Sequence, residues 1–575
     1  MTLNRIAAAL AMALSTPAAL AAPSLFNFQW SYQHTGNAAS QAQGSEILAF
    51  DGQTRRLWVI GTDGNITNPV GRSGIDVLDL SGALVNSINL QSVGGVNSVA
   101  IANGRAAVAI TAPVKTNPGV VQFYNTSTFG NLANVTVGAN PDSVTFTPDG
   151  SKLLVANEGE PINYTTAPDP VGSVSIIDAS TFSATTAGFE AFNSQAAALR
   201  SAGVRLLDPT KLTTAGYTPP TVAQDLEPEY IAVSQDGSTA AVTLQEANAV
   251  AFVDIATSTV TSIKALGLKD HSLPGNGLDV SDRDFPNITP TPSPNTNNNI
   301  LNGQIQNWRV KGIYMPDGIA SFTQNGQQFY VTANEGDSRA DWPGYKDEVR
   351  LNDATVANGT PIDSALNTSL TAAYGADWRT NNDKLNRLVV STSGDLDGDG
   401  DLDELQAYGA RSFSILDANG NLVFDSGDQL EQIIKAQFMP STSCTLATAG
   451  CLWDDTRSDN KGPEPESAVI GQIGSDTLLF LGLERSNAIM VWNLNNRSAP
   501  SFVEMIYHTG DVGPEGLSFF TDGGYGYLAV SSEVSGSTAL YRTAAPVPVP
   551  AAVWLLGSAL GALGLSRRRA KADRG

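Results

Sequence analysis

Residues 141–146 read PDSVTF and residues 154–158 read LVANE, and the same order returns as PDGIA at 316–320 and YVTANE at 330–335. Each copy joins a turn that carries an acid to a short apolar strand, a polar turn and a second apolar strand that ends in another acid. Further copies begin at Glu46, Asn97, Glu229, Glu466 and Glu515. A strand-rich unit that recurs every ~40 to 50 residues is typical of a β-propeller with one blade per copy. The sequence therefore predicts an all-β fold, a seven-bladed β-propeller.

The propeller is expected to occupy residues 22–543, with the two chain ends meeting in one blade. The last repeat shows only three clear strands, so residues 25–33 are expected to supply its outer strand and remove the open edge. Long insertions are expected at 190–226, 267–315, 337–410 and 425–464. They interrupt connections that lie on one face of a propeller. We therefore expect them to crowd that face, where loops on a rigid scaffold often carry function.

The composition narrows the class of partner. The chain has 33 Lys and Arg against 56 Asp and Glu, which gives a formal net charge of −23. Nucleic acid is not an expected partner, because binding phosphates needs a basic face, whereas divalent cations suit an acidic one. The three histidines, His34, His271 and His508, are far apart and in no metal-ligand spacing. Cys444 and Cys451 are expected to form a disulfide in an oxidising compartment, with a thiol metal site as the alternative.

Both chain ends carry targeting features. Residues 1–21 combine an early Arg5, an apolar run and a small-residue cleavage site, which predicts a secretory signal peptide. Residues 544–575 hold a Pro-rich spacer, an apolar span at 551–565 and three arginines at 567–569, which predicts a membrane anchor helix. This tail resembles the PEP-CTERM sorting signal of Gram-negative bacteria, although VPVP replaces the usual Pro-Glu-Pro. The resemblance implies export to the cell envelope and processing by an exosortase-type enzyme.

Acidic residues occupy two corresponding positions of nearly every repeat. The residue before the first strand is Glu46, Asn97, Asp142, Glu229, Asp317, Glu466 and Glu515 in the seven copies. The residue after the second strand is Asp63, Ala112, Glu158, Glu246, Glu335, Glu484 and Glu533. Because the first strand of a blade is innermost, these acids are expected to ring the mouth of the central channel. Their repulsion must be relieved by bound cations, by Lys or Arg partners or by raised pKa values.

Calcium is the cofactor that these carboxylates predict, since Ca²⁺ prefers clustered carboxylate and carbonyl oxygens. The expected ligands at the mouth are Glu46, Asp142, Glu229, Asp317, Glu466 and Glu515. A structural alternative is that the acids cap turns by accepting bonds from backbone N–H groups of the next blade. Arg72, Arg339 and Arg485 are local cations that could neutralise part of the charge.

A second predicted Ca²⁺ site is the acidic stretch 395–404, DLDGDGDLDE. Oxygen ligands at alternate residues around a glycine turn can wrap a Ca²⁺ ion. The predicted ligands are Asp395, Asp397, Asp399, Asp401 and Asp403. Gln406 stands where an EF-hand needs glutamate, so an isolated calcium loop is the better interpretation; a solvated acidic turn is the alternative.

Several motifs resemble those of the choice-of-anchor I family of exported propellers. They are LVANEGEP at 154–161, LEPEY at 226–230, ANEGDSR at 333–339, GARSFS at 409–414, GPEPE at 462–466, LERSN at 483–487 and GPEG at 513–516. The resemblance spans about residues 30–542. It implies a propeller with a variable C-terminal anchor, and some members carry alkaline-phosphatase-like or phytase-like labels.

Two classes of function follow. The first is a non-enzymatic, Ca²⁺-loaded surface protein that binds an exopolysaccharide or an envelope protein. The second is a metal-dependent phosphoesterase, in which carboxylate-held cations clamp a phosphate ester and activate water. Its candidate residues are Glu158, Glu335, Glu466, Glu484, Glu515, Arg339, Arg411, Arg485 and Lys461. A lactonase-type hydrolase with one channel Ca²⁺ is a third interpretation.

Overall fold

The computed structural model describes residues 24–34, 44–62, 73–163, 169–212, 218–283, 304–341, 344–353, 359–437, 445 and 450–547. The signal peptide predicted at 1–21, Asp63, Arg72, Cys444 and the apolar span predicted at 551–565 lie outside these residues. Cys451 is disulfide-bonded, and Cys444 is the only other cysteine in the sequence. Among the described residues, no helix is long and apolar enough to cross a membrane.

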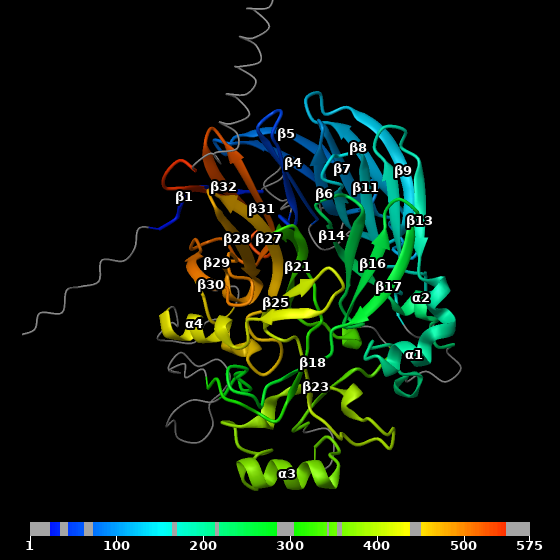
Figure 1. Cartoon of the computed structure of the whole chain (residues 1–575), viewed down its shortest axis with the longest axis vertical. Coiled ribbons are helices and arrows are strands. Elements are labelled where there is room, and N and C mark those ends of the chain that lie inside the picture. Colours follow the sequence, from blue (N-terminus) through cyan, green and yellow to red (C-terminus); the bar gives the residue numbers. More distant parts are fainter. Residues whose placement is uncertain are drawn as a thin grey trace, which may run out of the picture.

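Seven four-stranded antiparallel sheets form the larger part of the described structure (Figure 1). Sheet 1 has β2 (Leu48–Asp51), β3 (Arg56–Thr62), β4 (Ser73–Asp79) and β5 (Leu84–Asn89), and sheet 2 has β6 (Gly95–Ala102), β7 (Arg105–Thr111), β8 (Pro118–Asn125) and β9 (Asn131–Ala139). Sheet 3 has β10 (Pro141–Phe146), β11 (Lys152–Asn157), β12 (Ser173–Asp178) and β13 (Ala184–Gly188), and sheet 4 has β14 (Pro228–Val233), β15 (Thr239–Leu244), β16 (Ala249–Asp254) and β17 (Thr259–Ala265).

The other three sheets follow the same plan. Sheet 5 has β20 (Ile319–Gln324), β21 (Gln327–Asn334), β25 (Ser412–Asp417) and β26 (Leu422–Asp425), and sheet 6 has β27 (Pro465–Ile473), β28 (Asp476–Leu483), β29 (Ala488–Asn493) and β30 (Ser501–Ile506). Sheet 7 has β31 (Pro514–Asp522), β32 (Tyr525–Ser532), β33 (Ser537–Thr543) and β1 (Phe26–Gln33). The first strands contact one another in the closed order β2, β6, β10, β14, β20, β27, β31 and back to β2. This arrangement is a β-propeller, and its cores lie between neighbouring sheets.

The two chain ends meet in sheet 7, as the sequence predicts. β1 pairs antiparallel with β33 over Phe26–Gln33. Beyond the strand, the His34 ring bridges two sheets: Nδ1 lies 2.9 Å from Asp76 Oδ2 and Nε2 lies 2.8 Å from Thr538 Oγ1. All three side chains are buried. Backbone pairing and a buried polar bridge therefore hold the N-terminal segment in the ring.

Two of the predicted insertions fold together, and the other two pack against the propeller sheets. Residues 190–226 contain α1 (Ala196–Ser201) and α2 (Val222–Asp225), and residues 425–464 contain α4 (Gln429–Gln437). The insertions at 267–315 and 337–410 share a sheet in which β18 (Leu268–Asp270), β19 (Lys311–Ile313) and β24 (Gln406–Tyr408) are neighbours. The second also holds β22 (Glu348–Arg350), β23 (Val389–Ser391) and α3 (Ser364–Tyr374).

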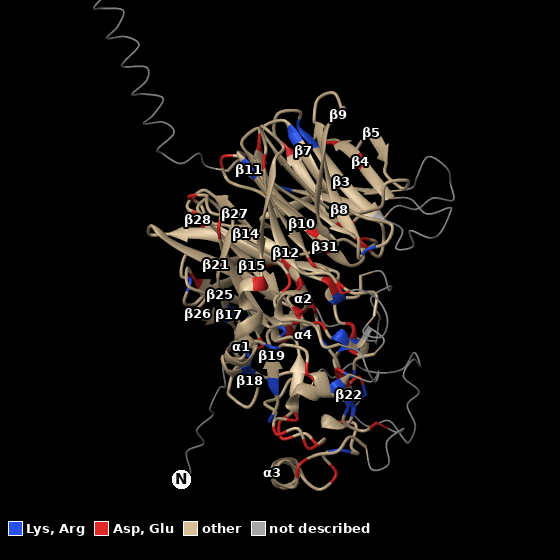
Figure 2. Ribbon diagram, turned by 90° about the vertical axis from the view of Figure 1, so that its right-hand side faces the viewer, with Lys and Arg blue, Asp and Glu red and all other residues tan. Residues whose placement is uncertain are grey.

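These two insertions have a hydrophobic core of their own, which includes the buried Trp308, Leu370, Trp378 and Val390. Figure 1 shows β18, β23 and α3 gathered beyond one side of the sheets, and Figure 2 shows charged residues of both signs around α2, α4 and β22. The sequence predicted that the insertions share a face, but not that these two share a hydrophobic core.

Candidate functional site

A proline and a local irregularity place each of four channel acids. Asp142, Glu229, Glu466 and Glu515 each follow the proline that opens the first strand of sheets 3, 4, 6 and 7. In all four sheets the pairing register shifts directly after that proline and becomes regular only three residues later. Such a bulge turns a side chain out of the ladder. The acid therefore leaves the sheet where the strand begins, at the channel.

Backbone strain accompanies this arrangement. Asn140, Met315 and Glu464 precede the prolines of sheets 3, 5 and 6 and have φ values of 47°, 48° and 48°. Non-glycine residues seldom adopt this left-handed conformation, and it costs free energy unless the surroundings enforce it. The same conformation thus recurs before the acid in three sheets, where the surrounding structure must enforce it.

The acids converge on one open pocket of about 320 Å³. Eleven of its fourteen lining residues are acidic: Asp142, Glu158, Glu160, Glu227, Glu229, Glu246, Asp317, Glu335, Asp337, Glu466 and Glu515. Asn140, Tyr230 and Gln245 complete the lining. Five of the six acids before the first strand and three of the six after the second strand thus face one space; Glu46, Glu484 and Glu533 are not in the lining, and Asp63 lies outside the described residues.

Three of these acids, Glu160, Glu227 and Asp337, were not among the predicted site residues. Their signal is present in the sequence as a second acid two residues from a predicted one, in NEGE at 157–160, LEPE at 226–229 and NEGD at 334–337. The pocket therefore receives two acids at several of the positions where the repeat predicts one.

Some predicted residues lie outside the pocket lining. Glu46 is not part of it, although its charge raises the pKa of Glu515. Glu484 lies behind the pocket, where Arg485 Nε is 3.1 Å from its Oε2. Sheet 2 carries Asn97 in place of an acid, and its amide donates to Thr111 Oγ1 and to the Pro141 carbonyl. The acidic lining is thus concentrated on sheets 3 to 7.

Burial makes the charges of the pocket costly. It raises the pKa of Asp142 and of Glu246 to about 7. It also raises the pKa values of Glu229, Asp317, Glu466 and Glu515 well above the ordinary range, and neighbouring carboxylates add to each shift. Without a ligand, the pocket therefore holds several protons near neutral pH.

The turn-cap alternative fails for these acids. Among the described residues, no backbone N–H donates a hydrogen bond to the carboxylate of Asp142, Glu229, Asp317, Glu466 or Glu515. Oε2 of Glu229, of Glu466 and of Glu515 is buried and has no hydrogen-bond partner. Carboxylates that capped turns would be satisfied by the backbone, so these oxygens are available for another donor or a cation.

Two groups of three carboxylates have oxygens within 4.8 Å of one another: Asp317 with Glu335 and Glu466, and Glu335 with Glu464 and Glu484. The second group is already neutralised, because Arg457 Nε lies 2.6 Å from Glu464 Oε1 and Arg485 Nε lies 3.3 Å from its Oε2. Burial would raise the pKa of Glu464, but Lys461, Arg457 and Arg485 lower it below its usual value.

The first group has one cation at its edge, Lys461, whose Nζ is 3.3 Å from Glu335 Oε1. Asp317, Glu335 and Glu466 are therefore the best-formed set of ligands for a divalent cation in the pocket. Carboxylate oxygens are the ligands that Ca²⁺ prefers.

Two predicted site arginines have other roles. Arg339 is 1% exposed; its Nη2 donates to the Asp225 carbonyl and forms an ion pair with Asp225 Oδ1 at 3.1 Å, and its Nη1 donates to the Glu246 carbonyl. Arg411 is 2% exposed and binds Glu431 Oε1 at 2.9 Å and three backbone carbonyls. Neither guanidinium lines the pocket, and the role predicted for them, neutralising the leaving anion of a phosphate ester, stays a prediction. The carboxylate partners of both guanidiniums are buried, so each needs a positively charged side chain beside it.

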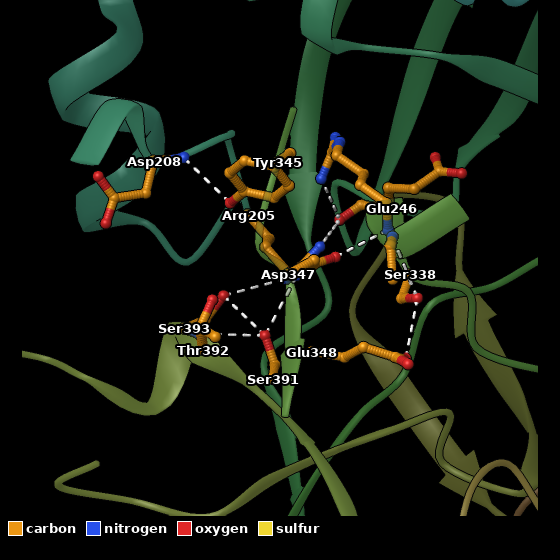
Figure 3. Close-up of polar contacts among 12 residues, drawn as sticks. Arg205, Asp208, Glu246, Ser338, Tyr345, Asp347, Glu348, Ser391, Thr392 and Ser393 are labelled. Carbon is orange, nitrogen blue, oxygen red and sulfur yellow. Dashed lines mark hydrogen bonds and ion pairs between the residues drawn. The ribbon is translucent and has the colours of Figure 1, made fainter. Parts of the chain in front are cut away.

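Arg205 joins the same network from the insertion at 190–226 (Figure 3). It forms an ion pair with Asp347, stacks over the Tyr408 ring and donates to the Glu246 carbonyl. Asp347 also accepts from the Arg339 backbone N–H at 2.8 Å. Two arginines thus hold the backbone of Glu246 from behind the pocket.

The acidic loop predicted at 395–403 divides into two groups. Oxygens of Asp395, Asp397 and Asp399 lie within 4.8 Å of one another, whereas Asp401 and Asp403 group with Asp363. Asp395 is also ion-paired to Lys211 at 2.5 Å. The five aspartates therefore do not form one group; the chain turns between them at Gly398 and Gly400, which have φ values of 82° and 99°.

The fold and the pocket define a β-propeller with an acidic channel mouth. The chain matches the choice-of-anchor I domain over residues 46–497 and belongs to that family. Membership in this family and the propeller fold indicate a surface-associated protein.

Two curated proteins are similar over shorter stretches. Gigasin-3a of Magallana gigas is 32% identical over 126 residues, 21% of this chain and 44% of that protein. The mesenchyme-specific cell surface glycoprotein of Strongylocentrotus purpuratus is 23% identical over 273 residues, 43% of this chain and 33% of that protein. The chain thus spans less than half the length of these relatives.

Solved structures are similar at low sequence identity. Hydrazine synthase of Kuenenia stuttgartiensis has a TM-score of 0.44 at 11% identity and covers 89% of this chain and 99% of its own. The Cps50 (Swd1) β-propeller domain of Myceliophteria thermophila has a TM-score of 0.40 at 8% identity, and the match covers 90% of this chain and 99% of that domain.

Proposed function

We propose that this protein is a seven-bladed surface propeller that binds a divalent cation, Ca²⁺ by ligand chemistry, at Asp317, Glu335 and Glu466. The observation that carries the proposal is the approach of these three carboxylates to within 4.8 Å in a pocket whose lining includes eleven acids. A bound cation removes the repulsion that otherwise forces the pocket to hold protons.

The proposed role is that of a binding protein. Three protein carboxylates leave coordination positions of Ca²⁺ open, since this ion takes six to eight oxygen ligands. An anionic group of an exopolysaccharide or of an envelope protein could complete the shell, so the cation would join an acidic protein to an acidic partner.

Export and anchoring are part of this proposal. Residues 1–21 would direct secretion, and residues 544–575 would hold the protein at the envelope of a Gram-negative cell until an exosortase-type enzyme processes it. Support comes from the sequence features of both ends and from membership in a family of surface propellers. Fractionation tests this: the full chain should appear in the membrane fraction of the envelope, and a chain that lacks 544–575 should appear in the soluble periplasmic or extracellular fraction.

Equilibrium dialysis with ⁴⁵Ca²⁺ tests the cation site. The purified chain should bind Ca²⁺ saturably, and Glu335→Gln should weaken binding by about tenfold or more, because one charged ligand is lost. Glu190→Gln, an exposed acid outside the pocket, is the matched control and should leave binding unchanged. Equal binding by Glu335→Gln and Glu190→Gln would place the ion elsewhere.

A metal-dependent phosphoesterase is the second candidate, and Lys461 is the observation that favours it. Its Nζ lies 3.3 Å from Glu335 Oε1 and 3.1 Å from Asp337 Oδ1, so a positively charged side chain lies beside the proposed metal ligands. Metal-activated water and a lysine beside it could cleave a phosphate ester. Aryl phosphate turnover with Ca²⁺ that disappears in Glu335→Gln would support this function; turnover unchanged in that variant would exclude this site.

A further inference from the structure

The half of the pocket on sheets 3 and 4 has a different geometry from the half that contains Asp317, Glu335 and Glu466. Glu158 and Glu160 follow β11, Glu227 precedes β14 and Glu246 follows β15; we call these four residues the acidic arc. All four line the pocket, and each is affected electrostatically by others of the set. Burial raises the pKa of Glu158 and of Glu227 well above the ordinary value.

The acidic arc is too wide for a single bare ion. Among the described residues, no three carboxylates of the arc have oxygens within 4.8 Å of one another, in contrast to Asp317, Glu335 and Glu466. A cation bound here must therefore present several donors spread over a larger group.

Existing cations satisfy only part of the arc. Lys115 Nζ lies 2.7 Å from Glu160 Oε2, at one end. Burial raises the pKa values of Glu227 and Glu246, and the guanidinium of Arg339 offsets part of that rise. Arg339 is itself buried and donates to the Glu246 carbonyl. Oε2 of Glu246 is buried and has no hydrogen-bond partner. Glu246 Oε2 thus lacks a donor, whereas Glu158 and Glu160 both accept from the side-chain amide of Asn140.

Two residues next to the arc also favour a ligand that donates hydrogen bonds. Glu229 is 8% exposed, lines the pocket and has an unpartnered Oε2. Tyr230 follows it in β14 and contributes an aromatic ring to the lining. Buried acceptors beside an aromatic ring are the surroundings in which an organic cation binds through charge-assisted hydrogen bonds and a cation–π contact.

We propose that the acidic arc and Tyr230 bind a guanidinium group, as a second subsite beside the metal ligands. Guanidinium has five N–H donors in a rigid plane, so it can reach carboxylates that no single ion joins. An ammonium group is a compact point charge and fits this spacing less well. The inference rests on the proposed function in one respect: Ca²⁺ at Asp317, Glu335 and Glu466 neutralises the other half of the pocket and leaves the arc to the organic cation.

Calorimetric titration of the full chain in buffer with Ca²⁺ tests the proposal. The probes are methylguanidinium, methylammonium and the peptides Gly-Arg-Gly and Gly-Lys-Gly. Methylguanidinium should bind saturably and about tenfold more tightly than methylammonium, since two or more charge-assisted hydrogen bonds distinguish them. Tighter binding of Gly-Arg-Gly than of methylguanidinium would identify a peptide as the source of the group, and equal binding a small free ligand.

The variants separate this inference from the proposed function. Glu227→Gln with Glu246→Gln should weaken methylguanidinium binding by about tenfold and leave Ca²⁺ binding unchanged. Asp317→Asn with Glu335→Gln should remove Ca²⁺ binding; the proposed function fails alone if ⁴⁵Ca²⁺ binding survives in that variant. Tyr230→Leu keeps every carboxylate and should also weaken methylguanidinium binding. Equal affinity for methylguanidinium and methylammonium, or no effect of Glu227→Gln with Glu246→Gln, would overturn the inference.

Discussion

At the scale of single residues, the protein uses a repeated three-residue device to build its pocket. A strained residue, a proline and an acid follow one another at Asn140-Pro141-Asp142, Met315-Pro316-Asp317 and Glu464-Pro465-Glu466. The acids were predictable, because they stand at corresponding places in each repeat. The left-handed conformation before the proline was not, because Asn, Met and Glu have no shared preference for it.

The protons held by the pocket predict a pH dependence of Ca²⁺ binding. Burial and neighbouring carboxylates raise the pKa values of the proposed ligands Asp317 and Glu466 well above the ordinary range, so these acids hold protons that Ca²⁺ must displace. Affinity should therefore fall as the pH decreases from 8 to 6, by about tenfold per pH unit for each proton displaced. Dialysis at pH 6, 7 and 8, with proton release measured in weak buffer, checks this. A constant affinity over that range would show that the acids near the ion do not titrate.

At the scale of secondary-structure elements, the hairpin turns and the closing strand follow local rules. Asn325 and Gly326, between β20 and β21, both have positive φ, as a tight hairpin turn requires. Asp149 and Asp236 accept bonds from the turns after β10 and β14, which lowers the pKa of each to about 2. These short-range preferences made the four-strand unit predictable, including the fourth strand of sheet 7 from residues 25–33.

The buried bridge of His34 predicts a large loss of stability on its removal. His34→Ala deletes two bonds, to the buried Asp76 carboxylate and the buried Thr538 hydroxyl, and leaves a cavity in place of the ring, so the free energy of unfolding should fall by about 2–4 kcal/mol. His508→Ala is the control: His508 also pairs with an aspartate, Asp511, but its side chain is 36% exposed, so the loss should stay below about 1 kcal/mol. Urea unfolding measures both. Similar losses would show that ring closure does not depend on the bridge.

At the scale of the whole molecule, the net charge of −23 is unevenly distributed, because many of the acids lie together in the pocket. Turn aspartates are satisfied by hydrogen bonds, whereas the pocket concentrates eleven acids in one opening. The propeller makes this possible because sheets 3 to 7 deliver acids to the same axis and the rigid ring bears the repulsion.

Metal removal should therefore destabilise the protein in a pH-dependent manner. For an acid whose folded-state pKa is raised, the folded state binds more protons than the unfolded state between about pH 4.5 and 7, so stability falls as the pH rises through that window. The EDTA-treated chain should melt at a lower temperature at pH 8 than at pH 5.5, and Ca²⁺ at 100 times its Kd should restore about 2.7 kcal/mol at pH 8. Glu466→Gln with Glu515→Gln should reduce the pH effect. Melting curves that do not respond to Ca²⁺ would contradict the role assigned to the pocket.

The sequence by itself determined the repeated unit, the all-β propeller, the closure of the ring by residues 25–33 and the convergence of acids on the channel. All of these depend on local alternation, turn residues and position within a repeat. Only the tertiary structure decided which acids lie within 4.8 Å of one another, that Glu160 and Glu227 join the pocket, that Arg339 and Arg411 are buried away from it and that two insertions share a core. Those outcomes depend on packing between segments distant in the chain, for which no local pattern exists.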